Sequence, residues 1–147
     1  MNKDFCNIDE IKRLIPHRYP FLLIDKVINI VKNESATGIK NVTVNEPYFE
    51  GHFPSSPVLP GVLQIESMAQ TAAVLVAKSL NFSDSNALVL LTTIDNAKFR
   101  KPISPGDVML LSITVQKKRN KLWKFEGEVI VNSQKISECE FSAMMRI

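Results

Sequence analysis

The stretch GVLQIESMAQTAAVLVAKSL, residues 61–80, determines how the rest of this sequence is arranged. It contains strong helix formers, no proline, and no glycine after Gly61, so it predicts one helix about 28 Å long. Apolar side chains occupy nearly every side of that helix. Such a helix must be covered by protein rather than by water. We therefore expect the flanking segments to wrap around it.

The segments on both sides of this helix have the composition of β-strands. Strand patterns rich in β-branched residues or alternating in polarity occupy residues 21–31, 36–44, 87–99, 107–117, 122–131 and 135–145. The turn-forming KNES between the first two predicts a hairpin. The sequence therefore predicts an α+β fold in which an antiparallel β-sheet wraps around one long central helix.

Two further segments complete the predicted organisation. Asn7 and Glu10 have the spacing of a helix start, and apolar residues recur at helical spacing until Pro16 ends them. Residues 47–60 hold half of the prolines in the chain and predict a rigid, irregular lead-in to the long helix. No repeat or linker divides the sequence, so we expect a single domain over residues 1–147.

Charge and hydropathy exclude several classes of protein. The net charge of +3 is small beside that of nucleic-acid binders, so we expect no nucleic-acid partner, although an acidic protein partner suits it. Polar residues in the long helix, Glu66 and Lys78 among them, argue against a membrane span. The N-terminus lacks a signal-peptide pattern, and the two cysteines are far apart and expected to be reduced, so we expect a cytoplasmic protein.

Glu66 and His52 are the residues best suited to acid–base chemistry. Glu66 is the only acidic residue between positions 51 and 83, and burial in an apolar helix raises the pKa of a carboxyl group towards that of a general acid. The ordinary alternative is that Glu66 reaches solvent, pairs with a basic residue or bonds Gln70. His52 lies in GHFP on the proline-rich lead-in, where a histidine is otherwise structural or exposed. Two titratable groups in different surroundings are how acid and base roles separate.

The start of the long helix offers backbone donors beside these residues. The N–H groups of Gly61 and Val62 have no acceptor within the helix, and such a helix start favours negative charge. They can meet water, or hold a thioester oxygen that gains charge during a reaction. We interpret His17 as structural. No metal-ligand spacing, dinucleotide fingerprint or phosphate loop is present, so cofactor-free acid–base chemistry without a metal is expected.

Two basic clusters are visible in the sequence. The first contains Lys98, Arg100 and Lys101 in AKFRKP, next to a rigid corner where a partner could dock. The second occupies residues 117–121 at an expected hairpin tip. Runs of this kind are usually solvated turns.

Several blocks of the sequence resemble FabZ-type 3-hydroxyacyl-[acyl carrier protein] dehydratases. These blocks are LIPHRYPFLLID (14–25), KNVTVNEPYFEGHFP (40–54), GHFPSSPVLPGVLQIESMAQ (51–70) and IDNAKFRKPISPGD (94–107). The resemblance covers about residues 9–147 and implies the hotdog fold. It also implies a homodimer, often a trimer of dimers, in which His52 of one subunit faces Glu66 of the other.

The same resemblance implies the chemistry of type II fatty-acid synthesis. His52 removes the α-proton of a (3R)-hydroxyacyl thioester, Glu66 protonates the β-hydroxyl, and the Gly61 N–H polarises the carbonyl. The substrate is held on the phosphopantetheine of acyl carrier protein, which docks near Arg100 and Lys101, and no other cofactor takes part. Related dehydratase-isomerases of the FabA type carry aspartate at the position of Glu66, which favours simple dehydration here. The alternatives are a hotdog acyl thioesterase and a non-catalytic acyl-binding hotdog domain.

Overall fold

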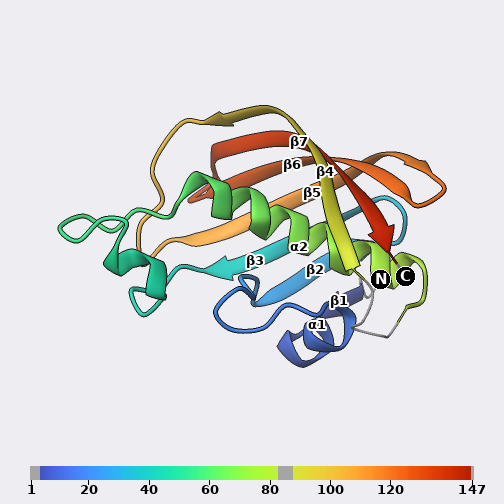
Figure 1. The fold of residues 1–147 in the computed structure, drawn as a ribbon, viewed down its shortest axis with the longest axis horizontal. Coiled ribbons are helices and arrows are strands. Elements are labelled where there is room, and N and C mark those ends of the chain that lie inside the picture. Colours follow the sequence, from blue (N-terminus) through green and yellow to red (C-terminus); the bar gives the residue numbers. More distant parts are fainter. Residues whose placement is uncertain (1–3, 83–87, 147) are drawn as a thin grey trace.

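The fold of this chain is an antiparallel sheet curved around a central helix, as predicted (Figure 1). The structure is a computed structural model that describes residues 4–82 and 88–146. In chain order the elements are β1 (Asp4–Cys6), α1 (Ile8–Leu14), β2 (Lys26–Val31), β3 (Ser35–Asn41), the 3₁₀ helix η1 (Pro47–Glu50), α2 (Gly61–Ser79), β4 (Leu88–Phe99), β5 (Val108–Arg119), β6 (Leu122–Val131) and β7 (Gln134–Arg146). The seven strands lie in the order β1-β2-β3-β5-β6-β7-β4.

The core lies between α2 and the inner face of the sheet. Alternate residues of β5, β6 and β7 point towards the helix and are buried, which is the pattern of a sheet with one covered face. Phe125 is central to this layer, and its ring stacks against Trp123 at 6.1 Å and Phe141 at 5.2 Å between ring centres. From Gln64 to Ala77, every residue of α2 except Glu66 is buried. The prediction of a helix covered by protein is therefore confirmed.

Helix α2 and strand β3 approach each other very closely at Gly38. A Cβ atom at this position would lie 2.1 Å from the Thr71 hydroxyl oxygen of α2, which no real contact allows. Only glycine therefore permits the helix to lie this low on the sheet.

The first predicted strand, residues 21–31, begins later than expected. Phe21 to Asp25 are not part of β2, because the side chain of Gln70 on α2 forms hydrogen bonds with the backbone of this segment. The Leu23 N–H donates to Gln70 Oε1 at 2.9 Å, and Gln70 Nε2 donates to the Phe21 carbonyl at 2.8 Å. The second strand also ends earlier than predicted, at Asn41, and the short strand β1 was not predicted.

The proline-rich lead-in to α2 is irregular, as expected, and is fixed at two points. An ion pair between buried Lys40 and partly buried Glu46 holds its beginning on β3. Near its end, the Leu59 N–H donates to the Ile103 carbonyl at 2.8 Å. The second contact joins the lead-in to the KPISPGD corner and so brings the first basic cluster to the start of α2.

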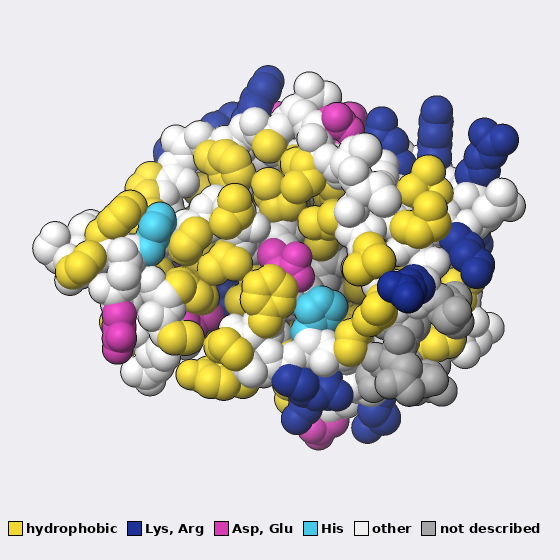
Figure 2. All heavy atoms as spheres, viewed as in Figure 1, with side chains coloured by type: hydrophobic (Ala, Val, Ile, Leu, Met, Phe, Trp, Pro, Cys, Tyr) yellow, Lys and Arg dark blue, Asp and Glu magenta, His cyan; other side chains and the backbone are white. Residues whose placement is uncertain are grey.

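Strand β4 forms one edge of the sheet and carries an exposed apolar surface. Its large exposed side chains are Leu90, Leu91, Ile94 and Phe99. Figure 2 shows the same face as Figure 1, with hydrophobic side chains across its centre and lysine and arginine mostly at its border. A long apolar edge strand attracts another strand unless it is covered. Within residues 4–82 and 88–146, no helix is long and apolar enough to cross a membrane.

Candidate active site

His52 is held in one orientation by the loop that precedes α2. Its Nδ1 lies 2.7 Å from the carbonyl oxygen of Val58, and its ring stacks on Phe53 with 4.0 Å between centres. A carbonyl oxygen can only accept a hydrogen bond, so Nδ1 carries the proton. In the neutral form of the ring, Nε2 is therefore the nitrogen without a proton and can act as a base.

The hollow beside His52 contains the start of α2 and part of the first basic cluster. Its volume is about 420 Å³, and its lining includes Gly61, Gln64, Arg100 and Lys101. Within α2, the Pro60 carbonyl accepts from Leu63 and Gln64, so the N–H groups of Gly61 and Val62 lack acceptors in the helix. These donors therefore lie on the same side of the fold as His52.

Gly61 is required by close packing at this point. A Cβ atom on Gly61 would lie 2.9 Å from Cε1 of Phe99 on β4. Any side chain at position 61 would displace the Phe99 ring from its place above the helix start. The absence of a side chain lets β4 cover the first turn of α2.

Glu66 lies further along α2 in a smaller hollow. This hollow has a volume of about 120 Å³, and β4 contributes Val89, Leu90 and Leu91 to its lining. The Glu66 side chain is 19% exposed. Burial raises the pKa of its carboxyl group, and a hydrogen bond from Gln70 partly opposes that rise.

Gln70 holds the Glu66 carboxyl group in place. Its Nε2 donates to Glu66 Oε1 at 3.0 Å and to the Phe21 carbonyl, while its Oε1 accepts from the Leu23 N–H. These three contacts fix which end of the Gln70 amide faces Glu66, because only the nitrogen can donate. The hydrogen bond between Glu66 and Gln70, which the sequence offered as one alternative, is present together with the burial of Glu66.

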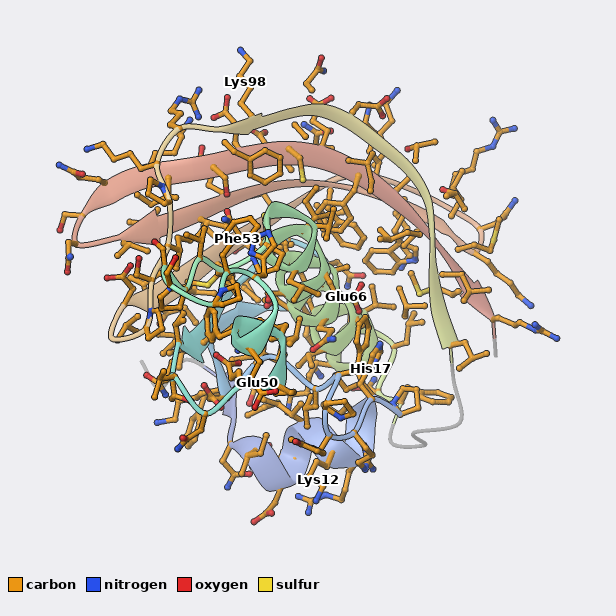
Figure 3. All side chains as sticks on the ribbon, turned by 60° about the vertical axis from the view of Figure 1, so that its left-hand side comes forward. Lys12, His17, Glu50, Phe53, Glu66 and Lys98 are labelled. Atoms are coloured by element: carbon orange, nitrogen blue, oxygen red, sulfur yellow. The ribbon has the colours of Figure 1, made fainter. Side chains whose placement is uncertain are left out.

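His17 also faces Glu66, a contact that sequence reasoning missed. The two side chains face each other between α2 and the segment that follows α1, and Nε2 of His17 lies 3.6 Å from Oε1 of Glu66 (Figure 3). The two residues are 49 positions apart in the sequence. Nothing in LIPHRYPF itself indicates this neighbour.

The predicted site residues fall into two groups within one chain. His52, Gly61, Arg100 and Lys101 line the larger hollow, whereas Glu66 lines the smaller one. Arg100 is paired with Glu138 at 3.0 Å, and Lys101 is hydrogen-bonded to Gln134 at 2.7 Å.

Lys98 is separate from both hollows. Its side chain points outwards from β4 (Figure 3). Within the described residues, no cluster of three or more histidine, cysteine, aspartate or glutamate side chains is arranged to hold a metal ion.

The curved sheet, the covered central helix and the His and Glu beside it define a hotdog-fold protein with a candidate acid–base site. Residues 15–140 match the family described as FabA-like domain. The chain belongs to this family, and similar proteins carry the name 3-hydroxyacyl-[acyl-carrier-protein] dehydratase FabZ.

Relatives with that name are similar over almost their whole length. The protein of Rickettsia bellii is 56% identical over 95% of this chain and 96% of its own. The protein of Paramagnetospirillum magneticum is 52% identical over 95% of this chain and 86% of its own. The protein of Cereibacter sphaeroides is 55% identical over 97% of this chain and 92% of its own.

Solved structures support the fold independently of close sequence similarity. The dehydratase heterocomplex ApeI:P of Xenorhabdus doucetiae matches with a TM-score of 0.81 at 20% identity, over 94% of this chain and 91% of that chain. A sigma28-regulated virulence protein of Campylobacter jejuni matches with a TM-score of 0.69 at 15% identity, over 95% of this chain and 89% of that chain. The predicted hotdog fold is confirmed.

Proposed function

We propose that this protein dehydrates (3R)-hydroxyacyl-[acyl carrier protein] to the trans-2-enoyl thioester in type II fatty-acid synthesis. One observation carries the proposal: a histidine whose Nδ1 is bound to a loop carbonyl, which leaves Nε2 free, and a carboxyl group whose pKa is raised by burial both lie beside helix α2. The FabZ relatives carry this activity in their names and support it. The elimination of water needs one base and one acid of this kind.

The catalytic residues in this proposal are His52 and Glu66. His52 Nε2 takes the α-proton of the substrate, and the electron pair left on Cα moves to form the Cα–Cβ double bond. The N–H groups of Gly61 and Val62 stabilise the charge on the thioester oxygen. The bond from Cβ to oxygen breaks as Glu66 gives its proton to the leaving hydroxyl, which departs as water.

We place the complete site between two subunits of a homodimer. His52 and Glu66 line separate hollows in one chain, so neither hollow alone holds both groups. The Glu66 hollow is bordered by Leu90 and Leu91 of the exposed edge strand β4. Pairing this edge with a second copy covers its apolar residues and gives each Glu66 a histidine from the other subunit. Three such dimers form the proposed hexamer.

The acyl carrier protein is the proposed partner that delivers the substrate. Its phosphopantetheine arm carries the acyl group, and no other cofactor takes part in the proposed steps. Arg100 and Lys101 line the hollow of His52 and suit an acidic partner at its entrance. The Lys98 side chain points away from this hollow, which makes it the weakest member of the proposed docking set (Figure 3). We place the protein in the cytoplasm.

A hotdog thioesterase is the competing function, and the raised pKa of Glu66 argues against it. Hydrolysis of a thioester uses a carboxylate to activate water, whereas burial of Glu66 favours the acid form of its carboxyl group. The acid form suits protonation of a leaving hydroxyl instead.

Hydration of crotonyl thioester, followed by the loss of enoyl absorbance, tests the proposed function. Loss of absorbance without release of free thiol is the expected result for a dehydratase acting in reverse. Release of free thiol would identify a thioesterase. No reaction with any acyl length, with the fold intact, would identify a binding module.

A further inference from the structure

We propose that His17 is a positioning residue for Glu66, donating its Nε2–H to the carboxylate that remains after Glu66 has released its proton. Its significance for turnover rests on the proposed dehydratase function. The contact itself lies within one chain and does not depend on that function.

The distance between the two groups suits a contact that forms when Glu66 is charged. His17 Nε2 and Glu66 Oε1 are 3.6 Å apart, which is longer than a hydrogen bond. A protonated carboxyl group attracts an N–H donor weakly, whereas a carboxylate attracts it strongly. Catalytic hydrogen bonds are often long in the resting enzyme and shorten during the reaction. Gln70 already donates to the same oxygen at 3.0 Å, and a second lone pair remains for His17.

The surroundings of His17 indicate which nitrogen carries the proton. Nδ1 is buried and has no hydrogen-bond partner among the described residues. A buried N–H without an acceptor is rarer in proteins than an unpaired acceptor. The proton therefore belongs on Nε2, which faces Glu66.

The His17 ring is held in this orientation by its neighbours. It stacks on Phe21 with 6.3 Å between ring centres and an angle of 18° between planes. The next residue, Arg18, donates to the carbonyls of His17 at 2.7 Å and Ile15 at 2.9 Å, which fixes the local backbone. The ring can therefore approach Glu66 by a small side-chain movement.

The electrostatic surroundings keep His17 neutral and leave few other groups to stabilise a charged Glu66. Burial and the nearby Arg18 guanidinium lower the pKa of His17. Strand β4 presents only apolar side chains to this hollow, and α2 presents Gln70 as its other polar group. In the proposed dimer, His52 of the second subunit is the remaining titratable group that faces Glu66. Each neutral donor to the carboxylate makes Glu66 a stronger acid.

Carboxyl ¹³C NMR of protein labelled at glutamate Cδ tests this inference without substrate. The Glu66 resonance is identified by its absence from the Glu66→Gln protein. In His17→Phe, which keeps a stacked ring but has no donor, we expect the titration midpoint of Glu66 to rise by about half a pH unit or more. In His17→Gln, whose amide can donate from a similar place, we expect a midpoint close to that of wild type. His17→Leu replaces the Phe variant if the latter does not fold.

The results separate this inference from a purely structural role for His17. An unchanged midpoint in the donor-free variant, or an equal rise in both variants, would overturn it. In the pH profile of kcat for hydration, the acidic limb reports the carboxylate form of Glu66, which accepts the proton of water in this direction, and is expected to move to higher pH only in the donor-free variant. Failure of the hydration assay would reject the proposed function and leave the titration result standing. The absence of any shift would reject the role of His17 and leave the dehydratase intact.

Discussion

His52 and Glu66 lie beside the same helix, yet their surroundings differ in size and in charge. The His52 hollow has a volume of about 420 Å³ and includes Arg100 and Lys101 in its lining, whereas the Glu66 hollow has a volume of about 120 Å³ and holds the carboxyl group beside Leu90 and Leu91. His52 is hydrogen-bonded to a loop carbonyl, whereas Glu66 accepts a hydrogen bond from Gln70 of α2 and faces His17 of the segment after α1. The larger hollow of His52, the open region, therefore suits entry of a charged carrier arm. The smaller hollow of Glu66, the closed region, suits a carboxylic acid.

This difference shows how the region around one helix supplies both roles. The first turn of α2 offers unpaired N–H groups that favour negative charge. More than a turn later, the apolar surroundings disfavour the charge of a carboxylate. In the proposed mechanism, the loop before α2 therefore supplies the base and α2 itself supplies the acid.

Replacing the base is expected to have the largest effect. His52→Ala removes the free Nε2, so we expect kcat for hydration of crotonyl thioester to fall about a thousandfold. The imidazole side chain packs on Phe53 at the surface of a loop, so the melting temperature should change little. A variant that keeps a tenth or more of wild-type kcat would contradict the role of His52.

Replacing the acid is expected to have the next largest effect. Glu66→Gln keeps the size of the side chain and an oxygen that can accept from Gln70, but has no proton to give. We expect kcat to fall about a hundredfold or more. Glu34→Gln, which alters an exposed carboxylate far from α2 in sequence, is the control and should retain full activity.

Reversing the charge at the open region is expected to have a moderate effect on binding alone. Arg100→Glu with Lys101→Glu should raise KM about tenfold for carrier-protein substrates and leave KM for small thioesters unchanged. The matched control reverses Lys117 and Arg119, which are exposed at the end of β5. Equal effects on both kinds of substrate, or an equal effect of the control, would reject docking at Arg100 and Lys101.

The smallest predicted effect concerns stability and pH at the closed region. The folded protein raises the pKa of Glu66 above its ordinary value of 4.5, so the native state holds this proton more tightly than the unfolded state does. This raised pKa therefore lowers stability as pH rises from below 4.5 through the folded pKa. Glu66→Gln should melt higher than wild type at pH 8 and equally at pH 4. A lower melting temperature for the variant at pH 8 would show that the ionised group stabilises the fold.

Much of the fold was predictable because the patterns are strong and local. Helix α2 follows the predicted 61–80 within one residue, and β6 has the predicted bounds 122–131. Residues 21–25 were wrongly included in the first predicted strand, because their apolar composition is equally compatible with packing under Gln70. Lys40 was also missed, although the alternation in β3 places it on the inner face with Ala36 and Gly38.

The identity of the site residues could be predicted from the sequence, but the contacts that they make could not. Glu66 is the only acidic residue in the predicted helix 61–80, and this pattern indicated a buried acid. Burial raises its pKa, as expected. The contacts with His17 and Val58 depend on how distant or irregular segments fold back, which periodicity does not encode. The division of the site between two hollows likewise required coordinates.

Mixing the two catalytic variants tests the central claim that His52 and Glu66 act across two subunits. His52→Ala and Glu66→Gln are each inactive alone in this account, and each mixed dimer contains one site with both wild-type groups. After the subunits exchange at equal concentrations, the account predicts that activity recovers to roughly a quarter of wild type. No recovery, with exchange demonstrated by differently tagged subunits, would contradict a shared site and place both groups in one chain.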